Sequence, residues 1–199
     1  MYLAAGEFGT AAREYAIVFT RDAGGAPIPA ALLGLATDTN LYVGTDGEWR
    51  GRYVPAYLRR YPFMLATTDG ASSEYTVCID ETFSGFNTAR EGEQLIDDAG
   101  EQCPLLARSV EFLREFHQHT EMTARFCAAL DQAQLLEGMQ ANIALDGNTN
   151  FSLTGMYCVS RPRLAALDAT VLKTLFDPGY LELVYLHLHS LANLDRLLE

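Results

Sequence analysis

The order of apolar and polar positions divides the chain into a strand-rich first half and a helix-rich second half. In the first half, short runs of β-branched and aromatic residues alternate with Gly, Pro and Asp clusters, which is typical of strands joined by turns. A Thr45-Asp46-Gly47 turn between two such runs predicts a hairpin over residues 40–54. Further strands are predicted over 14–20, 30–35, 63–67 and 75–80.

The second half shows the 3–4 spacing of helices that bury one face. Cys103-Pro104 is expected to open the longest helix, which continues to about Leu130 with Leu113 and Cys127 on its buried stripe. A second hairpin is predicted around Asp146-Gly147-Asn148, with strands over 139–145 and 151–159, followed by helices over 164–176 and 180–198.

This order of elements predicts an α+β fold. We expect an antiparallel sheet from the N-terminal half, with hairpins, packed by C-terminal helices. We also expect one domain over 1–199, mainly β over 1–101, with helices and one β-hairpin over 102–199. The polar segment 81–100 reads as a long acidic loop with a short strand at Gln94 to Asp97.

Charge and composition exclude some functions. The net charge of −12 over 199 residues argues against nucleic-acid binding, although a local basic patch can still hold a small anion. No stretch reaches the length needed to span a bilayer, and the start lacks a signal-peptide pattern. We therefore expect a cytoplasmic protein without membrane insertion. The cysteines at 78, 103, 127 and 158 have no CxxC spacing, so reduced structural thiols are expected.

The stretch WRGRYVPAYLRRYPF, residues 49–63, is the strongest candidate for a binding site. It holds four of the fourteen Lys and Arg residues, three tyrosines and the only tryptophan. Pro55 and Pro62 limit any helix between them to about two turns. Guanidinium groups suit carboxylates, phosphates and aromatic faces. The candidate ligand contacts in this segment are Arg52, Tyr57, Arg59, Arg60 and Tyr61. Alternatively, these arginines pair with the protein's own acids, including those of the 81–101 loop.

Two His-x-His pairs, His117/His119 and His187/His189, raise the question of a metal site. Both pairs lie in predicted helices, where residues two apart diverge, so neither pair can chelate one ion. One inward histidine from each helix could meet beside Asp80 or Glu81, but a hydrogen-bonded core histidine is commoner. We expect no metal and no cofactor.

Enzymatic motifs are scarce. The sequence has no GxSxG elbow, no phosphate-binding GxxxxGK[ST] and no GxGxxG after a strand. Asp80 and His187 are the remaining candidates for chemistry or ligand contact, and we expect His187 to be partly buried with a polar neighbour from another element.

Several blocks of the chain resemble the bacterial SapC family. They are YVPAYLRRYPF followed by TVCID, the opening AAGEFGTAAREYAIVF, the hairpin ALDGNTNFSLTGMYCV and the near-terminal YLHLHSLANLDRL. The resemblance implies a link to a paracrystalline surface layer, and no accepted catalytic residues come with it. Family members are usually some tens of residues longer at the N-terminus, so the resemblance implies an N-terminal element that is absent here or supplied otherwise. Such proteins are often encoded beside halogenases, oxygenases and outer-membrane receptors.

Three hypotheses about function follow. The first is a non-enzymatic protein that binds a peptide, a small anionic ligand or a partner protein through the Arg/Tyr segment. The second is a small enzyme or enzyme accessory whose site joins Asp80, His187 and Arg59. The third is a surface-layer component or assembly factor.

Overall fold

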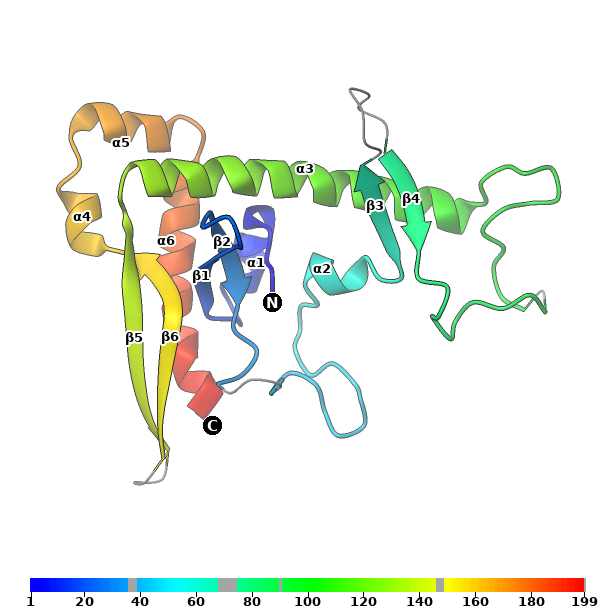
Figure 1. Cartoon of the computed structure of the whole chain (residues 1–199), viewed down its shortest axis with the longest axis horizontal. Helices are drawn as coiled ribbons and strands as arrows, with labels where there is room; N and C mark the ends of the chain where they lie inside the picture. Colours follow the sequence, from blue (N-terminus) through cyan, green and yellow to red (C-terminus); the bar gives the residue numbers. More distant parts are fainter. Residues whose placement is uncertain (36–38, 68–74, 90, 146–148, 199) are drawn as a thin grey trace. The chain divides into compact units, whose positions relative to one another are not determined.

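The computed structural model describes the chain except for residues 36–38, 68–74, 90, 146–148 and 199 (Figure 1). The chain forms two compact units. Unit 1 comprises Met1–Pro55 and His119–Glu199, and unit 2 comprises Ala56–Gln118. The longest helix, α3 (Pro104–Gln132), contributes residues to both units.

Unit 1 is built on a four-stranded antiparallel sheet in the order β2-β1-β6-β5. Its strands are β1 (Ile17–Arg21), β2 (Pro27–Ala31), β5 (Leu136–Leu145) and β6 (Thr149–Val159). β1 and β2 pair over five residues each, whereas β1 meets β6 at one pair, Phe19 with Tyr157. The sheet therefore joins an N-terminal hairpin to a C-terminal one, and the α+β class is confirmed.

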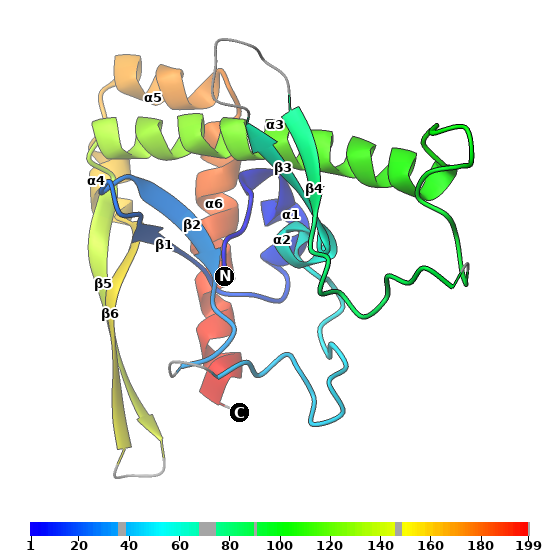
Figure 2. The same ribbon diagram turned by 45° about the vertical axis from the view of Figure 1, so that its right-hand side comes forward.

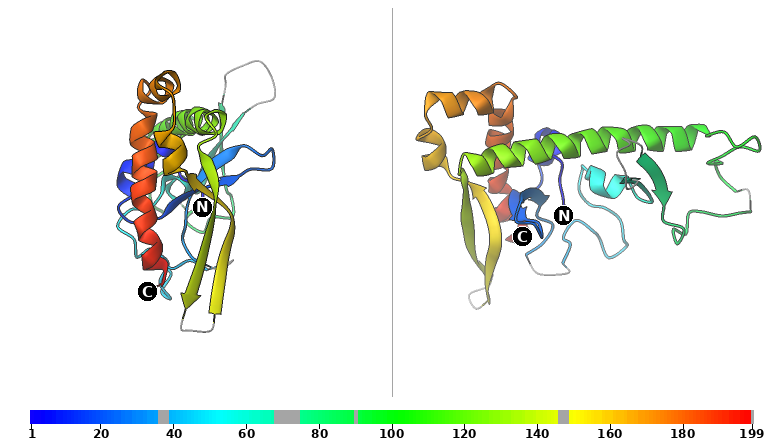
Figure 3. Two further views of the ribbon diagram at one scale, coloured as in Figure 1. Left: turned by 90° about the vertical axis from the view of Figure 1, so that its left-hand side faces the viewer. Right: turned by 45° about the horizontal axis from the view of Figure 1, so that its top comes forward.

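Both faces of β1 are buried, because successive strand residues point to opposite sides. Ile17 and Phe19 belong to the main core, whereas Val18 belongs to a smaller cluster that includes Leu197. Helix α6 (Tyr180–Ser190) contacts β1 and β6 (Figures 1 and 3). Helix α5 (Ala169–Phe176) lies across the beginning of α6 (Figure 2). The remaining short helices of this unit are η1 (Ala5–Glu7), α1 (Phe8–Ala11), α4 (Arg161–Ala165) and η2 (Leu191–Leu198).

Unit 2 contains a two-stranded antiparallel ribbon, helix α2 (Ala56–Arg59), the first half of α3 and a long connecting loop. The ribbon pairs β3 (Phe63–Thr67) with β4 (Tyr75–Ile79), from Phe63 opposite Ile79 to Thr67 opposite Tyr75. The Tyr75 hydroxyl lies 2.6 Å from Nε2 of His117 on α3, so this end of the ribbon is fastened to the helix.

Several predicted elements are confirmed. The strands over 63–67 and 75–80, the long helix and the second hairpin agree with β3, β4, α3 and the β5–β6 pair. The Asp146-Gly147-Asn148 turn lies outside the described residues. β1 begins three residues later and ends one residue later than the strand predicted over 14–20, whereas β2 begins three residues earlier and ends four residues earlier than the strand predicted over 30–35.

The predicted hairpin over 40–54 is present in a reduced form, with a turn at Gly44–Gly47 and backbone hydrogen bonds from Gly44 to Glu48 and from Arg50 to Tyr42. A bridge between Val43 and Trp49 joins its two arms. The carboxylate of Glu14 accepts the backbone N–H groups of Arg52 and Tyr53, so these groups take part in no strand ladder.

Three further boundaries differ from the prediction. The strand at Gln94 to Asp97 is reduced to one bridge between Ile96 and Gln102. The helix over 164–176 is divided, because Asp168 caps α5 by accepting from the N–H groups of Thr170 and Val171. The last helix changes from α to 3-10 geometry at Leu191. None of the described helices is long and apolar enough to cross a membrane.

Candidate functional site

The Arg/Tyr segment forms a short, proline-bounded helix in unit 2. Helix α2 begins directly after Pro55 and ends before Pro62, as the two prolines require. Arg60 is half-buried, with its guanidinium carbon 4.5 Å from the Tyr57 ring centroid and its Nε 3.3 Å from the Tyr57 carbonyl oxygen. One aromatic group of this segment, Tyr57, therefore stacks on one of its own arginines, Arg60.

Two neighbouring arginines line a small hollow beside this helix. Arg59 lies over the ring of Phe112, 5.0 Å from its centroid, and Arg60 lies 5.9 Å from that of Phe116. The hollow has a volume of about 170 Å³. Its lining consists of Arg59, Arg60, Phe63, Arg108, Ser109 and Phe112. Arg108 also pairs with Glu93 of the acidic loop at 3.4 Å, although both side chains are about two-thirds exposed.

Two of the predicted ligand contacts, Tyr61 and Asp80, lie side by side in the structure. The Tyr61 hydroxyl donates to Oδ2 of Asp80 at 3.0 Å, while Oδ1 accepts from the hydroxyl and N–H of Thr82 at 2.7 and 3.0 Å. These bonds favour the ionised carboxylate, so they lower the pKa of Asp80, with Thr82 contributing most. The same bond to Asp80 raises the pKa of Tyr61. Asp80 is therefore held as an anion.

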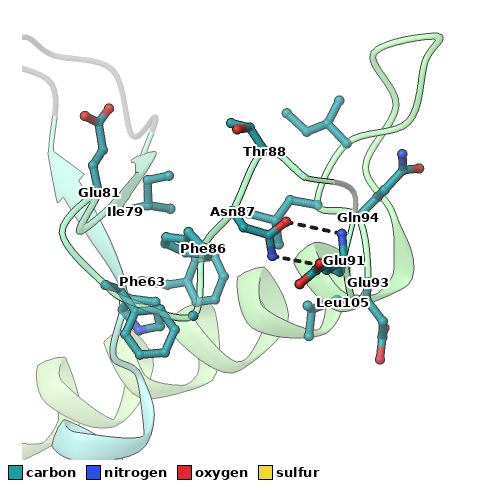
Figure 4. Close-up of a pocket in the computed structure, with 16 residues that line it drawn as sticks. Phe63, Ile79, Glu81, Phe86, Asn87, Thr88, Glu91, Glu93, Gln94 and Leu105 are labelled. Atoms are coloured by element: carbon teal, nitrogen blue, oxygen red, sulfur yellow. Dashed lines mark hydrogen bonds between the residues drawn. The ribbon is translucent and has the colours of Figure 1, made fainter.

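A larger hollow of about 640 Å³ lies next to this pair in unit 2. Phe63 and Phe83 each pack edge-on against Phe86, with ring centroids 6.0 and 5.4 Å apart. Tyr61 packs edge-on against Phe83 in turn, at 5.4 Å. Figure 4 shows Phe63 and Phe86 side by side, with Leu105 of α3 on the opposite side of the hollow. We call this the aromatic hollow.

The rim of the aromatic hollow is acidic. Glu81 lies just after β4, while Glu91 and Glu93 come from the loop across from it (Figure 4). The side chain of Asn87 fixes this loop, since its Nδ2 donates to the Glu91 carbonyl and its Oδ1 accepts from the Ala89 and Glu91 N–H groups. An apolar floor with carboxylates at its edge suits a group that is both apolar and cationic.

Sequence reasoning missed the floor of this hollow. Phe83 and Phe86 lie in a segment that reads as a solvated acidic loop, because it contains six acidic residues from Glu81 to Glu101. The available signal was the spacing of Phe83 and Phe86 around Gly85. A side chain at Gly85 would meet the ring of Phe83, with an added Cβ 2.4 Å from its Cε1.

Arg52 lies in unit 1, not with the other arginines of the segment. It lines a hollow of about 320 Å³ with Thr10, Arg13, Glu14, Tyr53 and Arg196. The segment 49–63 is thus divided at Pro55 between the two units.

His187 also lies in unit 1 and is fully buried. Its Nε2 accepts from the Val159 N–H at 3.0 Å, so the proton is on Nδ1, which donates to the Ile17 carbonyl at 2.9 Å. Burial lowers the pKa of His187 to about 4. The expected polar neighbours from other elements are present, but both are backbone groups, and burial is complete where we expected it to be partial.

Ser190 has a different role from the one its position suggests. Its hydroxyl donates to the carbonyl of His187 and accepts from the Ile17 N–H, and does not satisfy the imidazole ring. Together His187 and Ser190 bind both polar backbone groups of Ile17.

The two histidines of α3 have different surroundings. His117 is half-buried against Tyr75, whereas His119 is exposed in unit 1, where a Cβ added at Gly6 would lie 3.1 Å from its ring. Among the residues with described positions, no group of three His, Cys, Asp or Glu side chains is arranged to hold a metal ion. Arg59 and Asp80 belong to unit 2 and His187 to unit 1, so their joint site stays a prediction.

Comparison with known proteins gives one match. The sequence profile of the SapC family matches residues 1–197. No curated protein and no solved structure matches the chain.

Proposed function

The chain belongs to the SapC family, and we propose that it is a binding protein whose aromatic hollow in unit 2 receives a basic, apolar peptide segment of a partner protein. The observation that carries the proposal is the aromatic hollow itself, about 640 Å³ in volume, with phenylalanine rings on its floor and carboxylates on its rim. Pockets of this size, apolar with a few polar groups, are typical ligand sites.

Exposed apolar side chains around the hollow support a macromolecular partner. Ile96 is 55% exposed, Tyr61 51% and Ile79 42%, and Ile79 and Ile96 line the hollow directly. Apolar surface that stays exposed beside a hollow is typical of protein interaction sites.

Charge complementarity favours a basic segment. Glu81, Glu91 and Glu93 are all exposed, and the described lining of the hollow includes no lysine or arginine, although Arg108 pairs with Glu93 at 3.4 Å from outside it. A lysine or arginine on the peptide would gain attraction from these carboxylates and stacking from the phenylalanine faces.

The Arg/Tyr segment would then form one wall of the site. Pro62 and Phe63 line the aromatic hollow, and Phe63 also lines the smaller arginine hollow with Arg59, Arg60 and Arg108. An extended peptide that crosses Phe63 would place its basic side chain at the carboxylates. An acidic side chain of the same peptide would lie at the arginines, which keeps Tyr57, Arg59, Arg60 and Tyr61 as proposed contacts.

The proposal is tested with two fluorescent peptides that differ only in charge. One combines lysine with leucine and phenylalanine, and its twin carries glutamate for lysine. Fluorescence anisotropy is measured with the wild-type chain and with the triple variant Glu81→Gln, Glu91→Gln, Glu93→Gln. The matched control is Glu48→Gln, Glu111→Gln, Glu115→Gln, which removes equal charge at exposed positions outside the hollow.

We expect the lysine peptide to bind and the rim variant to bind it about tenfold more weakly at low salt, with the control close to wild type. Ile96→Ser should also weaken binding, because it removes an exposed apolar contact without disturbing a core. Equal weakening in the rim variant and the control would reject the site. If the protein instead preferred the glutamate peptide, and the double variant Arg59→Gln, Arg60→Gln lost that binding, the arginine hollow would be the binding site.

A further inference from the structure

Three arginines from distant parts of the chain line one hollow in unit 1. Arg13 follows α1, Arg52 lies in the loop after Trp49, and Arg196 is in η2 near the end of the chain. They line the same space of about 320 Å³, together with Thr10, Glu14 and Tyr53. The hollow thus holds three of the thirteen arginines of a chain whose net charge is −12.

The carboxylate of this hollow is already engaged. Glu14 accepts the Arg52 N–H at 2.8 and 3.0 Å through its two oxygens, and the Tyr53 N–H at 3.1 Å. Within the described parts of the chain, no carboxylate forms an ion pair with the side chains of Arg13, Arg52 or Arg196. The three guanidinium groups and one carboxylate leave a net charge of about +2 in the hollow.

The backbone segments that carry the arginines are fixed to one another. Tyr53 is anchored through its carbonyl oxygen, which accepts from the hydroxyl of Tyr15 and from Nε1 of Trp49. Nδ2 of Asn193 donates to the carbonyls of Ala12 and Tyr15, which fastens η2 to the segment after α1. The arginines therefore project from a preorganised frame, which lowers the entropic cost of binding a ligand.

We propose that this three-arginine hollow binds a small phosphomonoester. A phosphomonoester carries a charge of about −1.5 to −2 at neutral pH and three acceptor oxygens. Its charge matches the excess in the hollow, and its oxygens match the forked donors of the guanidinium groups. Thr10, which also lines the hollow, carries a hydroxyl that can add a neutral donor. The site lies in unit 1 and is independent of the proposed peptide site.

The test uses glycerol 3-phosphate as the free ligand and vesicles containing phosphatidic acid as the lipid form of the same group. Binding is measured by isothermal calorimetry at low ionic strength and by vesicle sedimentation, with glycerol and phosphatidylcholine vesicles as uncharged or zwitterionic controls. The variants are Arg13→Gln, Arg52→Gln and Arg196→Gln. Their matched controls are Arg125→Gln and Arg161→Gln, which alter exposed arginines of unit 1 outside the hollow.

We expect saturable binding of glycerol 3-phosphate, weakened about tenfold by each hollow variant and unchanged by the controls. If the protein bound the phosphatidic acid vesicles but not glycerol 3-phosphate, with the same dependence on the three arginines, the result would support the site and identify its ligand as a lipid phosphate. Equal losses in hollow and control variants would overturn the proposal, as would the absence of saturable binding to either probe. All five variants change exposed side chains, and a circular dichroism melt verifies that each remains folded.

Discussion

In the core of unit 1, Nδ1 of His187 donates a hydrogen bond to the carbonyl oxygen of Ile17 at a distance of 2.9 Å. The other ring nitrogen accepts from Val159 on β6, so one imidazole joins β1 to β6, whose described residues form one ladder pair, Phe19 with Tyr157. The ring thus supplements strand pairing, because each buried backbone group needs a partner. Its hydrogen bonds and burial give this histidine a structural role.

The neutral state of His187 makes stability depend on pH. Its pKa falls from 6.5 to about 4 on folding, because burial disfavours the charged ring. Between these values the unfolded chain binds more protons than the folded one, so the free energy of unfolding decreases as the pH falls. We expect this residue to account for a loss of about 3 kcal/mol from pH 7 to pH 4.

The variant His187→Gln isolates this contribution from that of the carboxylates. At pH 7 it should be less stable by about 2–4 kcal/mol, because the amide does not place its acceptor and donor where the two ring nitrogens lie, and it leaves part of the ring's volume empty. Urea unfolding at a series of pH values should show this difference shrinking toward pH 4. A constant difference across the series would mean that His187 does not change protonation on unfolding.

The thiols should react at different rates. All four cysteines are free, but Cys127 is buried and burial raises its pKa to about 12. Because the thiolate is the reactive form, Cys127 should react with a disulfide reagent more than about a hundredfold more slowly than Cys78 in the native protein. Four thiols should be counted after denaturation without reductant. Cys127→Ala should remove the slow phase, and Cys78→Ser should leave it intact.

Sequence periodicity predicted the elements whose hydrogen bonds are local or follow a regular pattern. The long helix and the second hairpin have uninterrupted apolar patterns, and both are present as α3 and the β5–β6 pair. The hairpin around Trp49 is shorter than predicted because a distant side chain, Glu14, takes the N–H groups of Arg52 and Tyr53. A strand pattern does not reveal such a competitor, which lies 38 residues away from Arg52.

The candidate site was predicted in part for the same reason. The short helix between Pro55 and Pro62 follows from proline geometry alone. The approach of Phe83 and Phe86 to Phe63 depends on how an irregular loop returns across the ribbon, and no periodic pattern encodes that path. The meeting of Arg13 with Arg196 likewise depends on η2 being anchored by Asn193.

Arg59 and Arg60 should differ in their effects on stability, as neighbouring helical positions do. Arg60 is half-buried against the Tyr57 ring and donates to the Tyr57 carbonyl, whereas Arg59 is exposed and lies over the ring of Phe112 at 5.0 Å. We expect Arg60→Ala to lower the free energy of unfolding by about 1 kcal/mol and Arg59→Ala by less than about 0.5 kcal/mol. Thermal and urea unfolding of the two variants would measure this. Equal losses would mean that both side chains stabilise the fold.

Thr82 and Tyr61 should lower the pKa of Asp80 by different amounts. Thr82 lowers the pKa of the carboxyl most, and the Tyr61 hydroxyl lowers it further. Thr82→Ala should therefore raise the pKa of Asp80 more than Tyr61→Phe does, and both variants should titrate above the wild type. Carbon-detected NMR of the Asp80 carboxyl carbon measures each value directly. The reverse order would show that the Tyr61 bond is the stronger of the two in solution.

Gly51 tests whether the loop from Trp49 to Tyr53 is as rigid as the three-arginine hollow requires. An added Cβ would lie 2.7 Å from both Nε1 of Trp49 and the hydroxyl of Tyr15. Neither atom can retreat freely, because both donate to the Tyr53 carbonyl and Tyr15 is fully buried. We expect Gly51→Ala to lower the free energy of unfolding by about 1–3 kcal/mol.

Gly9→Ala is the control, since its added methyl group meets nothing within 4 Å, and it should be neutral or stabilising by up to about 1 kcal/mol. Urea unfolding measures the stability of both variants. If Gly51→Ala were as stable as Gly9→Ala, the loop would be able to move aside for the added methyl group. Arg52 would then not be held in a preorganised position.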